Sequence, residues 1–147
     1  MESDPVSVIG CSWNPPWSWY VGDASAAVIL KFPGEVAVAY NGSRCSQART
    51  ISWNANWRFE CTNGVVVMQD DQVCTQLNSR EPVLALPVAM ARTEQAYLLH
   101  EFYMAVTTGA PPATTCQDNI HSLNILFDVV QSFESSKPTS AAKGKSA

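Results

Sequence analysis

Apolar and polar residues alternate along the first half of the chain, which is the pattern of half-buried β-strands. Residues 6–13 begin one extended segment, which breaks at Asn14-Pro15-Pro16 because two consecutive prolines remove two donors from a strand ladder. Residues 24–32 and 35–41 flank Pro33-Gly34, and the second of these segments alternates at period two. These two segments are predicted to form a β-hairpin.

Three further extended segments follow before the middle of the chain. Residues 50–61 carry aromatic side chains among polar ones, residues 65–69 follow the turn sequence Asn63-Gly64, and residues 73–77 follow Asp70-Asp71. Asn-Gly is a turn sequence that commonly joins paired strands. The first half is therefore predicted to be a β-meander of short strands.

The second half changes to the period of an α-helix. From Thr93, apolar residues fall at i, i+3, i+4 and i+7, which places them on one face of a helix about four turns long. Gly109 and then Pro111-Pro112 are expected to end this helix. The apolar face consists of Leu99, Phe102, Tyr103 and Val106.

A second helix is predicted to open at Thr115, a good N-cap, with Asp118 placed to complement the helix N-terminus. Two amphipathic helices after a set of strands indicate an α+β fold. The predicted buried stripe of this helix is Leu123, Leu126, Phe127, Val130 and Phe133, and the opposite polar stripe is Gln117, His121, Asn124 and Asp128.

Composition indicates one domain. The 147 residues are 46% hydrophobic and 15% charged, which is enough for one core. We expect a single domain over residues 1–136 and a disordered tail over residues 137–147, which lack bulky apolar side chains. The formal net charge of −4 and the absence of a basic stripe argue against a nucleic-acid partner.

The cysteines and the first residues bear on the compartment. The five cysteines form an odd set without a C-x-x-C pair, so neither a zinc ribbon nor a redox motif is indicated. Residues 1–10 lack the basic start of a secretory signal, and no apolar run is long enough to span a bilayer. A cytoplasmic protein with reduced thiols and no membrane association is the expectation.

Familiar catalytic motifs are missing. The closest glycines, Gly34 and Gly42, are eight positions apart, so neither G-x-G-x-x-G nor a P-loop is present. There is no G-x-S-x-G elbow and no H-E-x-x-H. His100 lies beside an apolar helix face and His121 on a polar one, and a structural role is the simpler interpretation of both. No catalytic, cofactor-binding or metal-binding residue is predicted.

The chain is rich in tryptophan, with five residues. Core burial is the simpler interpretation for any one of the rings, and stacking on a sugar or a protein partner is the alternative. Arg44, Arg49 and Arg58 lie near two of the tryptophans in sequence, and a guanidinium can bind a carboxylate or phosphate through two parallel hydrogen bonds. The tryptophans are Trp13, Trp17, Trp19, Trp53 and Trp57.

The order of these motifs resembles that of a known family. After the Pro33-Gly34 hairpin comes a turn at residues 61–64, then a helix of the type E-F-x-x-A-x-x-x-G-x-x-P, and then a helix that opens D-N-x-x-S-L. The resemblance, over roughly residues 5–138, is to the C-terminal half of Gfo/Idh/MocA oxidoreductases. The helix motifs are carried by Glu101, Phe102, Ala105, Gly109 and Pro112, and by Asp118, Asn119, Ser122 and Leu123.

The resemblance implies an open, mostly antiparallel sheet with two main helices packed on one face. Family members join this domain to a Rossmann NAD(P) domain, which carries a catalytic lysine in a Glu-Lys-Pro motif and is absent here. The implied function is a substrate-binding and oligomerisation domain of a sugar or polyol dehydrogenase, truncated or split so that the chain alone is not catalytically competent. Such a domain requires NAD or NADP only as part of a complete enzyme.

Two further expectations follow from the family. By position, residues 42–53 line the substrate pocket, which makes Arg44, Arg49 and Trp53 the candidate substrate contacts. The expected partner is a second copy of the chain or a Rossmann-domain partner or paralogue. The alternative is a stand-alone, non-enzymatic binding or assembly module that associates through the face of its sheet.

Overall fold

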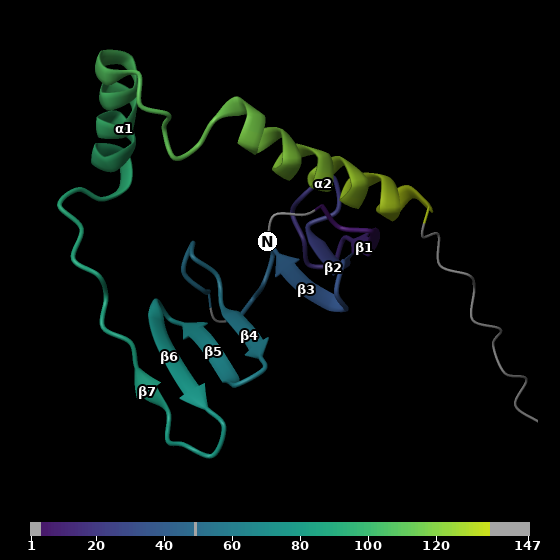
Figure 1. Ribbon diagram of the computed structural model, residues 1–147. Helices are drawn as coiled ribbons and strands as arrows, with labels where there is room; N and C mark the ends of the chain where they lie inside the picture. Colours follow the sequence, from purple (N-terminus) through teal and green to yellow (C-terminus); the bar gives the residue numbers. More distant parts are fainter. Residues whose placement is uncertain (1–3, 49, 136–147) are drawn as a thin grey trace, which may run out of the picture. The chain divides into compact units, whose positions relative to one another are not determined.

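The computed structural model describes residues 4–48 and 50–135 (Figure 1). The described residues form two compact units, one of residues 4–45 and 104–135 and the other of residues 46–48 and 50–103. Arg49 and the predicted tail at residues 137–147 lie outside the described residues, and the single domain over residues 1–136 stays a prediction. The elements are β1 (Ser7–Trp13), β2 (Ser25–Phe32), β3 (Val36–Ser43), β4 (Trp57–Cys61), β5 (Gly64–Gln69), β6 (Gln72–Leu77), β7 (Val83–Leu84), α1 (Glu94–Thr108) and α2 (Cys116–Ser135).

The first unit contains a three-stranded antiparallel sheet in the order β1-β2-β3. The predicted hairpin is confirmed, because Phe32 pairs with Val36 across a three-residue turn. Gly34 and Glu35 both have positive φ, 76° and 60°, and glycine adopts this conformation without strain. The Pro-Gly sequence therefore forms the turn that the alternation predicts.

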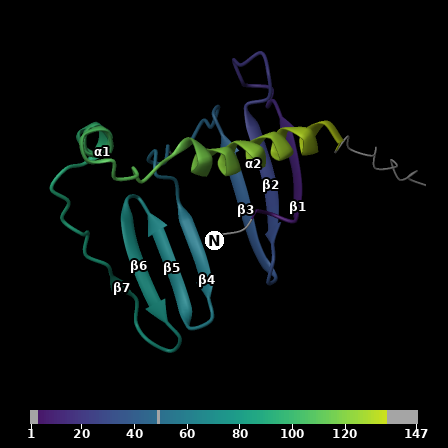
Figure 2. The same cartoon turned by 45° about the horizontal axis from the view of Figure 1, so that its top comes forward.

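Helix α2 packs on one face of this sheet, beside β1 (Figure 2). A Cβ atom built on Gly10 would lie 2.6 Å from Cε1 of Phe133, so the absence of a side chain at this position lets the ring approach the strand. The half-buried or buried residues on this side of α2 are Ile125, Val129, Ser132 and Phe133.

The predicted buried stripe of α2 is thus wrong for four of its five members. Only Phe133 faces the sheet, whereas Leu123, Leu126, Phe127 and Val130 are exposed in the structure. The reason is that α2 is apolar around more than half of its circumference, and periodicity alone does not say which part of a broad apolar surface meets the strand. The predicted polar stripe is exposed, as expected.

The second unit is an antiparallel sheet in the order β4-β5-β6-β7. Tight two-residue turns join β4 to β5 at Thr62-Asn63 and β5 to β6 at Asp70-Asp71. Both aspartates have positive φ, 52° and 62°, which is the backbone of a type I′ turn. The two-residue strand β7 pairs with Cys74 and Thr75 and is too short to give a sequence pattern.

The predicted strand at residues 50–61 is half wrong. Only Trp57–Cys61 is a strand; residues 53–54 form a turn, and the other residues from 50 to 56 have no regular structure. Serine and asparagine side chains in this stretch bond to nearby groups in place of a neighbouring strand, which is the usual way these residues compete with a ladder.

Helix α1 spans the boundary between the two units, and none of its residues is buried. It ends at Thr108, followed by Gly109 with a φ of 73°, so the predicted glycine stop is confirmed. The α+β class and the antiparallel pairing are also confirmed, with the strands divided between two sheets.

The core of the described residues is small, and its buried apolar members are Ala24, Val28 and Cys45. All five tryptophans are at least 45% exposed, so the simpler interpretation of them as core residues is wrong. Large aromatic side chains that stay in water on a folded chain indicate surfaces that contact other molecules.

Candidate functional site

The three predicted substrate contacts do not form one described cluster. Arg44 belongs to the first unit, Trp53 belongs to the second, and Arg49 lies outside the described residues. Each described candidate is therefore considered with its own surroundings.

Arg44 follows the end of β3 and is held through its backbone. Its N–H donates to the carbonyl of Ala24 at 2.8 Å, which continues the β2–β3 ladder by one step, while the side chain is exposed. An exposed guanidinium anchored at its backbone is free to turn toward an anionic or hydroxyl-rich ligand.

The neighbouring Cys45 anchors this end of the sheet. Its thiol is almost completely buried and lies 3.5 Å from Oγ of Ser43 and 3.9 Å from Oγ of Ser25. These hydroxyl contacts, led by Ser43, lower the pKa of Cys45, and burial acts in the opposite direction. The indole N–H of Trp17 donates to the Cys45 carbonyl at 3.0 Å and ties the β1–β2 loop to the same place. Cys45 is thus a structural residue that follows Arg44 directly in sequence.

Trp53 lies at the tip of a loop that is held by one carboxylate. Oγ of Ser52 and Nδ2 of Asn54 both donate to Oδ1 of Asp71 at 2.7 Å. These two hydrogen bonds, that from Asn54 first, lower the pKa of Asp71 because they stabilise its ionised form. The loop also closes on itself, since the N–H of Ala55 donates to the carbonyl of Ser52 at 3.1 Å.

The consequence is a fixed loop with an exposed ring. Trp53 is 95% exposed, although its two neighbours in sequence are bonded to Asp71. The next indole, that of Trp57, donates from Nε1 to the Asn54 carbonyl at 2.7 Å and stacks on Phe59 with ring centroids 5.9 Å apart. Rigid presentation of an indole face suits stacking on a flat or weakly polar ligand.

The family resemblance makes Trp53 a candidate contact, which stays a prediction, and it gives no hint of Ser52, Asn54 and Asp71, which hold its loop. A signal was present, because Asp70-Asp71 is a turn sequence and Ser and Asn side chains commonly bond in turns. What the sequence does not reveal is that the loop and the turn lie together.

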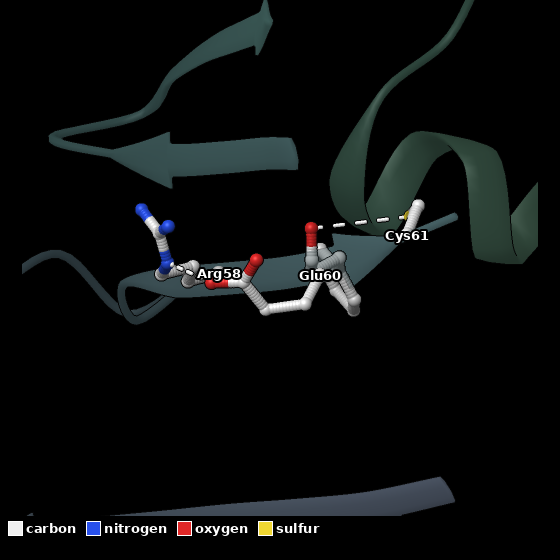
Figure 3. A network of polar contacts seen from close by, with 4 residues as sticks. Arg58, Glu60 and Cys61 are labelled. Carbon is white, nitrogen blue, oxygen red and sulfur yellow. Dashed lines mark hydrogen bonds and ion pairs between the residues drawn. The ribbon is translucent and has the colours of Figure 1, made fainter. Parts of the chain in front are cut away.

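Strand β4 carries an ion pair close to this loop in sequence (Figure 3). Nε of Arg58 donates to Oε1 of Glu60 at 2.6 Å, and both side chains are more than 60% exposed. Arg58 is thus engaged with its own strand, and only its terminal amino groups extend beyond the pair. The thiol of Cys61 donates to the Phe59 carbonyl at 3.9 Å in the same network.

The described residues do not fit a dinucleotide. A pyrophosphate binds at a helix N-terminus whose amides are open and approached by a glycine turn. At α2 the hydroxyl of Thr115 already accepts the N–H of Asp118 at 3.1 Å, and the Asp118 carboxylate adds negative charge there. The first turn of α1 likewise begins with the acidic Glu94.

Among residues 4–48 and 50–135, no cluster of three or more His, Cys, Asp or Glu side chains could hold a metal ion. Nδ1 of His121 lies 3.2 Å from a carboxylate oxygen of Asp4, and His100 is half-buried on α1. All five cysteines are free thiols. Within the part of the chain that the structure describes, no helix is long and apolar enough to cross a membrane.

The first unit also has an open groove of about 320 Å³ between the start of β1 and the C-terminal half of α2. It contains none of the predicted contacts. Its lining is largely polar and comprises Pro5, Val6, Ser7, Val8, Asp128, Gln131, Ser132 and Ser135.

Known proteins resemble the chain in sequence and, more clearly, in fold. No family model matches it. The uncharacterized protein y4oX of Sinorhizobium fredii is 22% identical over 146 residues, which cover 90% of this chain and 40% of that protein.

Solved structures give the stronger similarity. An aldose-aldose oxidoreductase from Caulobacter crescentus, solved with glycerol, matches with a TM-score of 0.75 and 13% identity over 91% of this chain and 40% of its own. An oxidoreductase from Agrobacterium radiobacter, solved with NAD⁺, L-tartaric acid and magnesium, matches with a TM-score of 0.71 and 11% identity over 91% and 42%. A putative oxidoreductase from Thermotoga maritima matches with a TM-score of 0.70 and 16% identity over 91% and 40%.

The chain thus spans about 40% of the length of these proteins. The chain has the fold of the C-terminal domain of Gfo/Idh/MocA-type oxidoreductases, as its sequence motifs predict.

Proposed function

We propose that the chain is the substrate-binding and oligomerisation domain of an NAD(P)-dependent sugar or polyol dehydrogenase. The observation that carries the proposal is the match of 91% of this chain to 40% of an aldose-aldose oxidoreductase at a TM-score of 0.75. In this proposal hydride transfer needs a nicotinamide held by a Rossmann domain, supplied by another polypeptide or by another part of a longer one. The described residues by themselves offer no dinucleotide site.

The proposed substrate contacts are Arg44, Arg49 and Trp53. The exposed indole of Trp53 supplies an apolar face on which a sugar ring stacks, and its loop is already ordered by Asp71. The guanidinium of Arg44 supplies several donors for hydroxyl or carboxylate oxygens. A glycerol and an L-tartaric acid accompany two of the similar oxidoreductases, and both molecules are rich in such oxygens.

The proposed association surface is the face of the first sheet that points away from α2. The register places Ile9, Ile29 and Ala39 in one row across the three strands, and all three are exposed. A row of apolar side chains on an open sheet is a common protein interface. The partner is a second copy or a Rossmann-domain protein, and the five free thiols suit a cytoplasmic enzyme.

The experiment is a pair of titrations on the full chain. Isothermal titration with NADH and NADPH is expected to show no binding in the micromolar range. Titration with D-glucose, myo-inositol and glycerol is expected to show weak binding of at least one, lost in Trp53→Ala. Trp19→Ala, which removes an exposed indole from the first unit, is the matched control and should retain binding.

Each outcome is informative. Low-micromolar binding of NADH to the chain alone would overturn the assignment of the cofactor site to another domain. Sugar binding that survives in Trp53→Ala would remove Trp53 from the site. If none of the three polyols binds while the chain still associates through its sheet, the stand-alone assembly module becomes the better description.

A further inference from the structure

Arg44 is fixed at its backbone to the end of the first sheet. Its N–H donates to the carbonyl of Ala24 at 2.8 Å. The next residue, Cys45, is 1% exposed, and its N–H donates to Oγ of Ser43 at 3.4 Å. Because Arg44 and the residue after it are both bonded to the sheet, the Cα atom of Arg44 has little freedom to move.

Trp17 holds the same place from the β1–β2 loop, residues 14–24. Its indole Nε1 donates to the carbonyl of Cys45 at 3.0 Å, across 28 positions of sequence. This bond clamps the chain one residue beyond Arg44, on the side opposite the anchor at Ala24. All of these contacts lie inside the first unit.

The loop that carries Trp17 is closed by its own hydrogen bonds. The N–H of Ser18 donates to the carbonyl of Pro15 at 2.9 Å, which forms a turn with a proline at its second position, as such turns favour. Nδ2 of Asn14 donates to the carbonyl of Tyr20 at 2.8 Å and joins the two sides of the loop. The indole of Trp17 is therefore held by an ordered loop and can hold Arg44 in turn.

The charge of Arg44 is not neutralised by the residues that the structure describes. No ion pair joins its guanidinium to a carboxylate among them. Asp23, which precedes the anchoring Ala24, accepts a hydrogen bond from Oγ of Ser12 at 2.5 Å. A guanidinium pairs best with a carboxylate, which accepts two parallel hydrogen bonds from it, whereas a single hydroxyl cannot match this fork. The group that best fits Arg44 is therefore a carboxylate.

We propose that Arg44 binds the carboxylate of a sugar acid and that Trp17 is the residue that positions Arg44 for this contact. The proposal rests on the proposed function, in which Arg44 is a substrate contact, and narrows the substrate class to sugars that carry a carboxylate. An arginine whose backbone is already fixed loses only side-chain freedom when it binds. Without the Trp17 bond, part of the binding free energy would be used to order the chain around Arg44.

The test of the substrate class compares D-glucuronate with D-glucose. The two sugars differ only at C6, where D-glucuronate has a carboxylate and D-glucose a hydroxymethyl group. In isothermal titrations of the full chain at fixed ionic strength, D-glucuronate is expected to bind about tenfold more tightly. Arg44→Ala should abolish this preference, and Arg44→Lys should restore only part of it because an ammonium lacks the fork.

The test of positioning removes one hydrogen bond and keeps the aromatic ring. Trp17→Phe lacks the indole N–H and should weaken binding of D-glucuronate by about threefold to tenfold while leaving the affinity for D-glucose unchanged. Trp19→Phe is the matched control, because it makes the same substitution in the same loop, at a ring that stacks on Tyr20 and forms no hydrogen bond with the described residues. This control should bind both sugars as wild type does. Circular dichroism checks that each variant keeps its fold.

A double-mutant cycle separates positioning from a general loss of structure. If Trp17 acts through Arg44, Trp17→Phe should have no further effect on D-glucuronate binding in the Arg44→Ala background. Equal weakening by Trp17→Phe with and without Arg44 would overturn the positioning role. Equal weakening of D-glucose and D-glucuronate by Trp17→Phe would overturn it as well, because a general loss of structure affects both sugars.

The substrate class has its own contradicting results. Equal affinity of the wild-type chain for the two sugars, or a preference for D-glucuronate that survives Arg44→Ala, would overturn recognition of a carboxylate by Arg44 and leave the proposed function intact. If D-glucuronate and the three polyols all fail to bind, the substrate-binding role in the proposed function is contradicted, and this proposal with it.

Discussion

Gly64 is the position where the backbone of the second unit depends most strongly on glycine. It has a φ of 152° and pairs with Cys61 on one side and Leu77 on the other. A Cβ atom built there would overlap the Gln76 carbonyl oxygen and lie 2.8 Å from Cα of Leu77. Both obstacles are backbone atoms of the paired strand, which cannot move aside as a flexible side chain does. We predict that Gly64→Ala disrupts the β5–β6 pairing.

The expected magnitude follows from two terms. A side chain in this glycine-only region of φ and ψ costs roughly 1–3 kcal/mol. Overlap with a packed neighbour adds about 1–3 kcal/mol. The gain from a less flexible unfolded chain, about 0.4–1 kcal/mol, offsets only part of this. The net loss is about 1–5.5 kcal/mol, which at its upper end is a large share of the total stability of a small domain.

Alanine substitutions at two other glycines measure the backbone strain separately from the steric overlap. Gly34 has a φ of 76° and open space around its Cβ position, so Gly34→Ala should cost only the backbone strain, about 1–2 kcal/mol. Gly22 has neither strain nor a close neighbour, so Gly22→Ala should be neutral or slightly stabilising.

Hydrogen exchange of the full chain, followed peptide by peptide, is the suitable assay because it reports each unit separately. Gly64→Ala should speed exchange over residues 64–77, and Gly34→Ala should speed it over the β2–β3 hairpin. Wild-type protection over residues 64–77 in Gly64→Ala would refute the reasoning, because it would mean that the strands tolerate a side chain where the structure leaves no room.

Three further predictions concern local contacts. Thr115→Ala removes the cap on the Asp118 amide and should cost about 1 kcal/mol in thermal melts, with no change in sugar binding. The pKa of Asp71 is lowered in the folded chain, so its stabilisation of the loop is complete above the ordinary pKa of 3.8 and is lost as the pH falls through the folded pKa. Tryptophan fluorescence of the wild-type chain should show the loop loosening in this acidic range. An acid transition that persists unchanged in Asp71→Asn would contradict this. Glu60→Ala breaks the exposed pair with Arg58 and should change stability by less than about 0.5 kcal/mol, so a larger loss in the melts would mean that the pair is not simply a surface contact.

The elements that follow from local chemistry could be predicted from the sequence. The Pro33-Gly34 hairpin, the Thr115 cap and the glycine stop after α1 each depend on a few adjacent residues, and each is present in the structure. The α+β order and the resemblance in fold follow from the same local patterns taken in sequence.

The buried face of α2 could not be predicted in this way. Whether an apolar side chain meets β1 depends on where the helix lies, and Gly10 decides this by leaving space for the Phe133 ring. The stripe with the strongest apolar character, which includes Leu123 and Phe127, lies elsewhere on the helix and stays exposed. Periodicity gives the same signal for an apolar stripe that packs inside its own unit and for one that does not.

At the candidate site too, the sequence indicates an individual residue but not the contacts that the fold brings to it. Trp53 is a candidate contact because of its position in the segment that the family resemblance assigns to the substrate pocket, but the order of its loop depends on Asp71, eighteen positions away. The carboxylate fixes the residues on either side of the ring, so the loop does not have to be ordered when a ligand stacks on it. A loop that is already ordered makes its exposed aromatic side chain a more effective contact, because the loop loses its conformational entropy during folding and not during binding. A substitution at Asp71 should therefore weaken ligand stacking on Trp53 while leaving the indole itself in place.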